Sequence, residues 1–200
     1  MRASSAERST ARDRAKADRR EVLLDAAARL FAERGFDRVS LEDLGAAAGV
    51  SGPAVYRHFP GKQAVLGALL VGVSENLVAG GAEVVARVEG ADDALAAIVA
   101  FHVDFALANP DVIRVQDRDL DSLADDDRGR VRSLQRTYID TWVGVLARVL
   151  PGVERPQLRI RARATFGLIN STPHSARSSP RAAVRALLES MALAALTTPV

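Results

Sequence analysis

The sequence predicts an all-α protein in which a small N-terminal domain with a helix-turn-helix precedes a larger helical domain. Apolar residues recur at helical spacing, first in the stripe formed by Leu23, Ala26, Ala27, Leu30 and Phe31. No segment between turn signals keeps up the alternation of apolar and polar residues that a half-buried strand requires. We therefore expect helices separated by short breaks along the whole chain.

Glycine and proline mark the breaks between these helices. Gly35 closes the first stripe, and Gly80-Gly81, Asn109-Pro110, Pro151-Gly152 and Ser171-Thr172-Pro173 interrupt the later ones. We expect the first helix at about 18–34. After the helix-turn-helix, further helices are expected at about 62–79, 92–108, 110–117, 123–149, 156–169 and 180–196.

Composition excludes several classes of protein. Hydrophobic residues make up 48% of the chain, which is enough for a buried core, and cysteine is absent. Disulfides, thiolate zinc sites and thiol redox sensing are therefore excluded. The longest apolar run, Ala64–Val73, is far shorter than the roughly 18–20 residues of a membrane span. Since the first twenty residues also lack the apolar segment of a signal peptide, we expect a cytoplasmic protein with no membrane partner, metal or cofactor.

Positive charge is concentrated at the N-terminus. Residues 1–20 carry seven Lys or Arg side chains and three acidic ones, whereas the whole chain has a net charge of +2. A basic arm on a nearly neutral body is typical of a protein that meets a polyanion at one end. The alternative is a solvated tail that only aids solubility. We expect residues 1–17 to form this flexible arm.

Residues 40–62, SLEDLGAAAGVSGPAVYRHFPGK, are predicted to form two short helices joined by a glycine turn. Ser40 and Asp43 match a capping box that begins the first helix. Gly49 supplies the turn, and Ser51 and Pro53 begin the second helix as its cap and first turn. Two helices joined in this way form the helix-turn-helix arrangement. The alternative is a helical hairpin whose second helix is merely solvated.

The second helix of this pair is expected to present its polar side chains outward. Val55 and Phe59 lie one helical turn apart and face the first helix, which leaves Tyr56 and Arg57 on the opposite side. The free amides at the helix start favour a phosphate or a base acceptor. Arg57 is the side chain best suited to a bidentate contact with guanine, whereas phosphate contacts position the helix. The residues expected at DNA on these grounds are Ser40, Gly52, Pro53, Tyr56, Arg57, His58 and Lys62.

Two runs within residues 21–62 carry a family resemblance. They are A-A-x-x-L-F-x-x-x-G-F at Ala26–Phe36 and L-x-x-L-G-A-A-A-G-V-S-x-x-A-V-Y-x-H-F-x-x-K at Leu41–Lys62. Both resemble the DNA-binding region of the TetR family. The resemblance implies a helical homodimer that represses transcription at a palindromic operator until a small molecule releases it. It implies phosphate contacts at Ser40, Ser51, Tyr56, His58 and Lys62 and base contacts at Pro53, Ala54 and Arg57. This chain departs from many members in having Gly52-Pro53 where they carry a Lys or Arg beside a Gly.

Aromatic and polar residues on separate helical segments of the larger domain are candidates for an apolar effector pocket. Ligand sites of this kind lie between bundled helices. The expected lining residues are Phe101, His102, Phe105, Ile113, Gln135, Tyr138, Trp142, Phe166 and Asn170, with Val112 and Val145 as further apolar candidates. The alternative is that most of these side chains are core and that His102 is an ordinary core histidine.

A dense basic segment precedes the end of the chain. Arg155, Arg159, Arg161 and Arg163 form either a solvated or dimer-rim face or a phosphate clamp for a coenzyme A thioester. Together with FGLINSTPHS at 166–175, this segment is similar to actinobacterial regulators that sense acyl-CoA intermediates.

The last helix is apolar over much of its circumference, which is typical of a helix buried on several sides. With the helix at 156–169, it is expected to pair with its two-fold mate in a four-helix bundle. The alternative is a core helix of a monomer. A two-fold dimer would place two recognition helices about one turn of DNA, or a multiple of it, apart.

Together these patterns predict a DNA-binding protein, and the family resemblance implies a one-component transcriptional regulator, a repressor that binds double-stranded operator DNA and is released by a small hydrophobic or acyl-CoA-like effector. DNA binding is expected in residues 18–62, and effector binding and dimerisation in residues 63–198. An enzyme is the first alternative, but His58, His102 and His174 lie far apart without a nucleophile–base pair, an HExxH motif or paired carboxylates. The second is an activator or a scaffold without DNA, since activators use the same helix-turn-helix.

Overall fold

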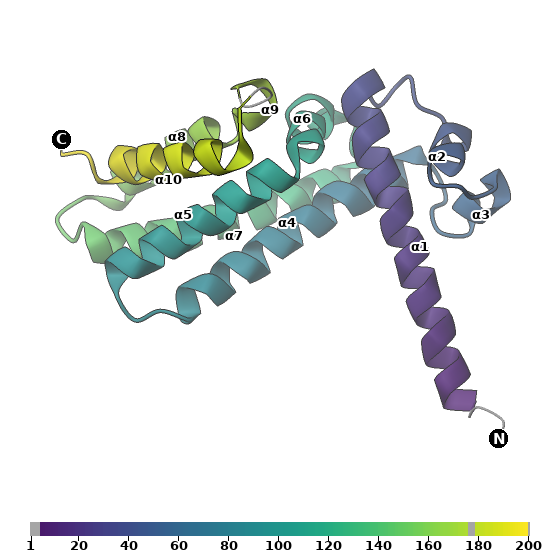
Figure 1. Ribbon diagram of the computed structural model, residues 1–200, viewed down its shortest axis with the longest axis horizontal. Coiled ribbons are helices and arrows are strands. Elements are labelled where there is room, and N and C mark those ends of the chain that lie inside the picture. The colour runs from purple at the N-terminus through teal and green to yellow at the C-terminus, as the bar shows by residue number, and fades with distance from the viewer. Residues whose placement is uncertain (1–4, 176–178, 200) are drawn as a thin grey trace.

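The computed structural model describes residues 5–175 and 179–199, and every regular element within them is a helix. The helices are α1 (Ser5–Arg34), α2 (Leu41–Ala47), α3 (Gly52–Tyr56), α4 (Lys62–Ala86), α5 (Ala91–Ala108), α6 (Pro110–Asp119), the short 3-10 helix η1 (Leu120–Ser122), α7 (Asp125–Val149), α8 (Arg155–Ile169), α9 (Thr172–Ser175) and α10 (Arg181–Thr197). Figure 1 shows α1 at one end of the molecule, with α2 and α3 on one side of it and the longer helices on the other. The expected all-α fold class is confirmed for these residues.

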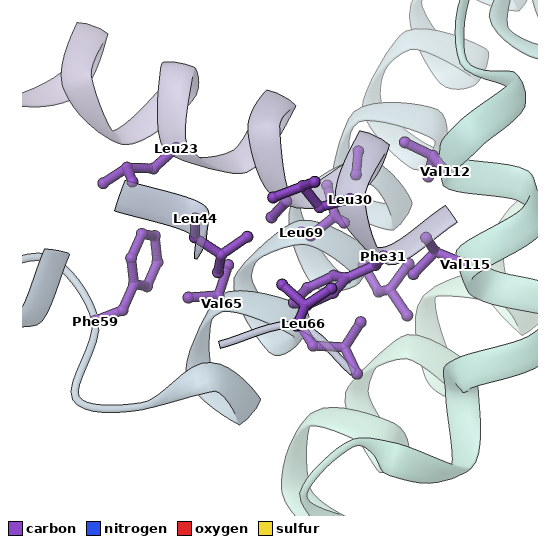
Figure 2. Packing of buried hydrophobic residues seen from close by; sticks show 14 of the residues in the cluster. Leu23, Leu30, Phe31, Leu44, Phe59, Val65, Leu66, Leu69, Val112 and Val115 are labelled. Carbon is purple, nitrogen blue, oxygen red and sulfur yellow. The ribbon is translucent and has the colours of Figure 1, made fainter. Parts of the chain in front are cut away.

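Two clusters of buried apolar residues hold the helices together. The first joins α1, α2, α3 and α4 to α6, and Phe31 is completely buried within it. Figure 2 shows Val112 and Val115 of α6 beside the side chains of α1 and α4. The second cluster joins α5, α7, α8 and α10 around Trp142, and α6 adds Ile113 to it. The helix α6 therefore belongs to both cores.

Two glycines in the left-handed region end helices near the N-terminus. Gly35 has a φ of 88° after α1, and Gly49 has a φ of 68° between α2 and α3. A Cβ would meet the following carbonyl in this conformation, so glycine is favoured there. The breaks predicted at both positions are confirmed.

The first helix is longer than expected. It begins at Ser5 instead of about residue 18, so residues 5–17 of the expected flexible arm belong to α1. The physical reason is composition, because this stretch is rich in Ala and Arg, which favour helix, and contains neither Gly nor Pro. Residues 1–4 of that arm, and 176–178 of the expected effector domain, lie outside the described residues.

The predicted break at Gly80-Gly81 is wrong, because α4 continues through it to Ala86. A Cβ on Gly80 would lie 2.5 Å from Cζ of Phe101, and a Cβ on Gly81 would lie 2.5 Å from Cε2 of Tyr138. These glycines make room for aromatic rings of α5 and α7. Ring packing offsets the roughly 1 kcal/mol that each glycine costs inside a helix.

Among the described helices, α4 has the length and apolar composition that would let it cross a membrane. It packs against α1, α5 and α7 along its length. These contacts are those of a central core helix.

Candidate functional site

The turn between α2 and α3 depends on close backbone packing. The N–H of Val50 donates to the carbonyl of Gly45 at 2.9 Å. A Cβ on Gly45 would lie 3.0 Å from the carbonyl oxygen of Val50 and 3.0 Å from Cγ2 of Val55. Gly45 therefore lets α3 approach α2. This role was not predicted; its signal is a glycine on the buried face of a short helix.

The helix α3 is anchored on one side and open on the other. Val55 and Phe59 are 0% and 3% exposed, as predicted, whereas Tyr56 is 55% exposed. Ser51 occupies the N-cap position, but its hydroxyl makes no cap hydrogen bond, which corrects the predicted cap. Of the predicted DNA-facing residues in this region, Ser51, Pro53, Tyr56 and Arg57 are exposed, and Gly52, Ala54 and His58 are half-buried.

The missing Ser51 cap has a simple geometric cause. Pro53 has no N–H to donate, and the N–H of Ala54 donates to the backbone carbonyl of Ser51 at 2.8 Å. The amides that an N-cap hydroxyl normally accepts from are therefore absent or used. The Ser51 hydroxyl remains at the surface.

Basic side chains of α1 and α3 surround the end of α3. Burial lowers the pKa of His58, and nearby positive charges lower it further. Those charges belong to Lys16, Arg57, Arg19 and Arg20, which we call the basic surface. All four side chains are exposed. The middle of α1 and the C-terminal end of α3 therefore present one positive region to solvent.

Two predicted phosphate ligands already have partners within the chain. The Ser40 hydroxyl donates to Oδ2 of Asp43 at 2.7 Å and accepts from the Asp43 N–H at 3.0 Å, so the predicted capping box is confirmed. The Lys62 ammonium donates to the carbonyls of Phe36 and Asp37 at 2.7 and 3.2 Å. Lys62 thereby ties the start of α4 to the loop after α1. One of its three N–H groups is left for a phosphate.

A cavity of about 170 Å³ lies between α4, α5, α6, α7 and α8. Seven of the nine predicted pocket residues line it, namely His102, Phe105, Ile113, Gln135, Tyr138, Phe166 and Asn170, and so does Val112. The lining residues that were not predicted are Ser74, Leu77, Gln116, Leu134 and Ile139. Helical spacing is the signal for three of them, since Gln116, Leu134 and Ile139 each lie one turn from a predicted residue.

Three candidate residues do not line the cavity. Phe101 packs over Gly80 on the neighbouring helix. Trp142 is completely buried, with its ring centroid 4.9 Å from that of Phe166, and Val145 is 2% exposed in the core. Periodicity identified these side chains as inward-facing, but Trp142 and Val145 point into packed core and the half-buried Phe101 packs against it, so none of them faces open space.

A buried polar chain runs through the aromatic wall of the cavity. Nε2 of His102 lies 3.2 Å from Oδ1 of Asn170, and Nδ1 lies 3.4 Å from the Tyr138 hydroxyl. Burial lowers the pKa of His102 to about 4 and raises the pKa of Tyr138. Both side chains are therefore neutral at pH 7. In this arrangement Tyr138 O–H donates to Nδ1, and Nε2–H donates to Asn170.

The helix α6 connects this cavity to α1. Val112 lines the cavity and also belongs to the core beneath α1. At the other end of α6, the Arg118 guanidinium donates to the carbonyls of Phe31 and Ala32 in the last turns of α1. It also donates to both carboxylate oxygens of Asp119. A cation is favoured at a helix C-terminus, so Arg118 caps α1 from α6.

Large apolar side chains are exposed on α8 and α10. Ile160 is 68% exposed, Leu187 is 60% exposed and Met191 is 44% exposed. The two helices pack against each other. They therefore carry apolar surface that this single chain does not cover.

The four arginines of α8 differ in whether they have partners within the chain. Arg159 pairs with Asp140 at 2.6 Å, and Arg161 donates to the carbonyl of Leu196 at 2.8 Å. Arg155 and Arg163 are exposed, and the described residues give them no ion pair.

Comparisons with known proteins agree with this arrangement. Residues 23–69 match the bacterial regulatory proteins of the tetR family, and residues 89–174 match the tetracyclin repressor-like C-terminal domain. The HTH-type transcriptional repressor KstR2 of Rhodococcus jostii (strain RHA1) is 30% identical over 132 residues. That alignment covers 66% of this chain and 65% of the relative, slightly less than two thirds of its length.

Solved structures share the fold at lower identity. A TetR-family transcriptional regulator from Bordetella parapertussis 12822 superimposes with a TM-score of 0.80 at 24% identity, covering 89% of this chain and 94% of that one. The transcriptional regulator FadR from Bacillus subtilis, solved in complex with stearoyl-CoA, gives a TM-score of 0.70 at 16% identity, covering 88% and 98%. One family match covers the helix-turn-helix, and the other covers the helices from α5 to α9. The chain belongs to the TetR family of bacterial transcriptional regulators and is not an enzyme.

Proposed function

We propose that the protein is a repressor that binds a palindromic operator as a homodimer and leaves it when an apolar or acyl-CoA-like effector binds. The observation that carries this proposal is the placement of α3, anchored by Val55 and Phe59 and open on its polar side beside the basic surface. The similarity to KstR2, a transcriptional repressor, supports the sign of regulation. The cytoplasm, where bacterial DNA lies, is the proposed site of action.

Phosphate contacts are expected to supply most of the affinity for DNA. Arg57, the C-cap residue of α3, carries bidentate donors for a base edge, which no side chain within α3 does. Phosphates are expected at Ser40, Ser51, Tyr56, His58 and the remaining N–H of Lys62, and bases at Pro53, Ala54 and Arg57, with Gly52 allowing close approach. The basic surface extends the phosphate contacts onto α1. Binding should therefore weaken steeply as salt concentration rises.

The homodimer is supported by the exposed apolar residues of α8 and α10. In a single chain, solvent surrounds much of the side chains of Ile160, Leu187 and Met191. A second copy related by two-fold symmetry would cover the same residues on both chains. The same symmetry repeats α3 on the DNA, which requires an operator with two-fold symmetry.

The route from effector to DNA is proposed to run through α6. An effector whose buried part is larger than the cavity of about 170 Å³ would displace a lining helix, and α6 supplies the lining residues Val112 and Ile113. Since Arg118 ties α6 to the end of α1, such a displacement would shift α1 and with it α3. An effector acts in this way only if it binds the displaced state more tightly.

An acyl-CoA effector would place its phosphates outside the cavity. FadR of Bacillus subtilis, which shares the fold, was solved with stearoyl-CoA. Arg163 and Phe166 of α8 and its C-cap Asn170 follow one another at helical spacing, so the exposed Arg163 lies along the same face as two lining residues. Arg161 is engaged with α10 instead. We propose Arg163 as the phosphate contact of such an effector.

Selection of binding sites from random duplex DNA tests the proposal. We expect a palindromic site, and Arg57→Ala should weaken binding to it by about 1–3 kcal/mol per half-site and relax preference at one base pair. Arg87→Ala, which removes an exposed arginine at the far end of α4, is the matched control and should bind like the parent. Unchanged binding by Arg57→Ala would refute the base-reading role. Deleting the gene should raise transcription beside the selected sites; a fall would show an activator.

A further inference from the structure

We propose that the cavity accepts an uncharged group bearing a hydrogen-bond-accepting oxygen, such as a ketone, ester or thioester carbonyl, and excludes carboxylates. The group is either a whole small molecule or the buried end of a larger effector. This inference rests on the proposed function, because it specifies the effector that the proposed function requires.

The first observation is the absence of formal charge around the cavity. None of the described residues that line it is Asp, Glu, Lys or Arg. The polar lining residues are Ser74, His102, Gln116, Gln135, Tyr138 and Asn170. A carboxylate that enters such a site loses its hydration and finds no opposite charge to replace it.

His102 does not supply the missing positive charge. It is 3% exposed, and its ring centroid lies 4.7 Å from that of Phe166 and 5.7 Å from that of Tyr138. Burial keeps its pKa at about 4, so the ring is neutral at pH 7. Both ring nitrogens already face partners, Tyr138 and Asn170.

The second observation is the direction of the polar chain through His102. With Tyr138 donating to Nδ1 and Nε2–H donating to Oδ1 of Asn170, the amide nitrogen of Asn170 ends the chain as a donor. The described residues that line the cavity provide no hydrogen bond to this nitrogen. Ser74 offers less, because its hydroxyl donates to the carbonyl of Leu70 at 2.7 Å. Gln116 and Gln135 also line the cavity, but each of their amides offers an acceptor as well as a donor. The unpaired donor of Asn170 therefore tips the preference toward an acceptor oxygen.

The third observation is size. An apolar cavity of roughly 150 Å³ holds a benzene molecule. At about 170 Å³, this cavity suits one ring with a short substituent. Leu77, Phe105 and Ile113 surround that volume with apolar surface. The preferred occupant is therefore a compact apolar body with one carbonyl at its edge.

Three probes of the same shape test this inference without DNA. They are cyclohexyl methyl ketone, isopropenylcyclohexane and cyclohexanecarboxylate, which carry a carbonyl oxygen, a methylene group in its place and a charged carboxylate. Trp142 is the only tryptophan of the chain and lies in ring contact with Phe166 and His102, so its fluorescence reports occupancy. At pH 7.5 the full-length protein should bind the ketone several-fold more tightly than the hydrocarbon. The carboxylate should bind at least tenfold more weakly than the ketone.

Asn170→Leu, which keeps the approximate size but removes the donor, tests the recognition group. It should bind the ketone and the hydrocarbon about equally, while Asn76→Leu, an exposed position on α4, should keep the parent preference. Asn170→Leu removes a buried hydrogen-bonding group and could change stability. Thermal unfolding of both variants, measured before titration, shows whether each is folded. A carboxylate that binds as tightly as the ketone, an unchanged ketone preference in Asn170→Leu, or no binding of any probe would each overturn the inference. Failure of the proposed function would appear separately, as loss of operator selection with these titrations unchanged.

Discussion

The helix-turn-helix and the proposed effector cavity consist of the same kind of helix, but they differ in how far apart in the sequence their contacting residues lie. In the first region, partners are close in sequence: Ser40 caps through Asp43, and Gly49 makes the turn. In the cavity, partners come from distant helices, as His102 meets Asn170. The first region is a closed unit around a dense core, whereas the second keeps open volume lined by neutral polar groups.

This difference matches the proposed roles of the two regions. A helix that reads DNA must be held in one orientation. The buried side chains of Val55 and Phe59 hold α3 in this way. A ligand site must have room, and its walls must be able to move. The helix α6 takes part in both regions, with Val115 in one core and Ile113 in the other. Substitutions in the two regions should therefore have different effects on stability, and substitutions in α6 should affect both regions.

The largest effect is expected from opening the dense core. Phe31→Ala removes a completely buried ring and should lower the free energy of unfolding by about 3–5 kcal/mol, because the packed neighbours cannot refill the space. Operator binding should fall with it. Urea denaturation followed by far-UV circular dichroism measures the change.

Phe105→Ala is the matched control in the other region. Phe105 is half-buried beside an existing cavity, so its loss should cost clearly less than that of Phe31. Equal losses for the two variants would contradict the contrast between a dense core and an open one.

The next largest effect concerns pH and belongs to the cavity. Burial lowers the pKa of His102 from 6.5 to about 4. Between these values the unfolded chain binds a proton that the folded chain does not, so the free energy of unfolding falls as the pH falls from about 7 to 4. The total loss is roughly 3 kcal/mol. Chemical denaturation at a series of pH values measures it.

His102→Gln should remove most of this pH dependence, because glutamine stays neutral throughout the range. His174→Gln changes an exposed histidine and should leave the pH dependence as it is in the parent. If His102→Gln lost stability with acid as steeply as the parent, other groups would be responsible.

How far sequence could predict each region follows from the range of its contacts. The capping box and the turn at Gly49 were predictable, because both depend only on residues a few positions apart in the sequence. The predicted Ser51 cap failed on an equally local detail, the missing N–H of Pro53. The intramolecular partners of Lys62 lie in the loop after α1, and no local pattern points to them.

The cavity was predictable only in outline. Helical periodicity tells which side chains point inward, but the rotation of each helix decides whether they meet core or open space. Phe101 and Trp142 meet core for this reason. Gly80 and Gly81 look like a helix break until Phe101 and Tyr138 are placed over them from two other helices.

A smaller effect is expected where the two regions join. Arg118→Ala leaves the carbonyls at the end of α1 uncapped and deprives Asp119, whose side chain is 8% exposed, of its cation. We expect a loss of about 1–2 kcal/mol in the free energy of unfolding. The amide of Gly35, which donates to the carbonyl of Phe31 at 2.8 Å, should also exchange its hydrogen faster.

Arg132→Ala is the control for Arg118→Ala, because Arg132 is an exposed arginine that lies 3.8 Å from an exposed Asp121. It should change neither stability nor exchange. Stability loss without faster exchange at Gly35 would show that Arg118 supports α6 alone and does not cap α1.

The smallest effect separates two roles of Ser40 in the DNA-binding region. Ser40→Ala removes the cap of α2 and should cost about 1 kcal/mol of stability. Asparagine and aspartate both cap helices well, so Ser40→Asn and Ser40→Asp should keep more of that stability. If a phosphate lies at this position, Ser40→Asp should bind the selected operator more weakly than Ser40→Asn, and the gap should narrow as salt is raised. Fluorescence anisotropy at two salt concentrations measures both affinities. Equal affinities for the two variants would leave Ser40 as a helix cap only, and the phosphate contacts of α2 would have to come from another residue.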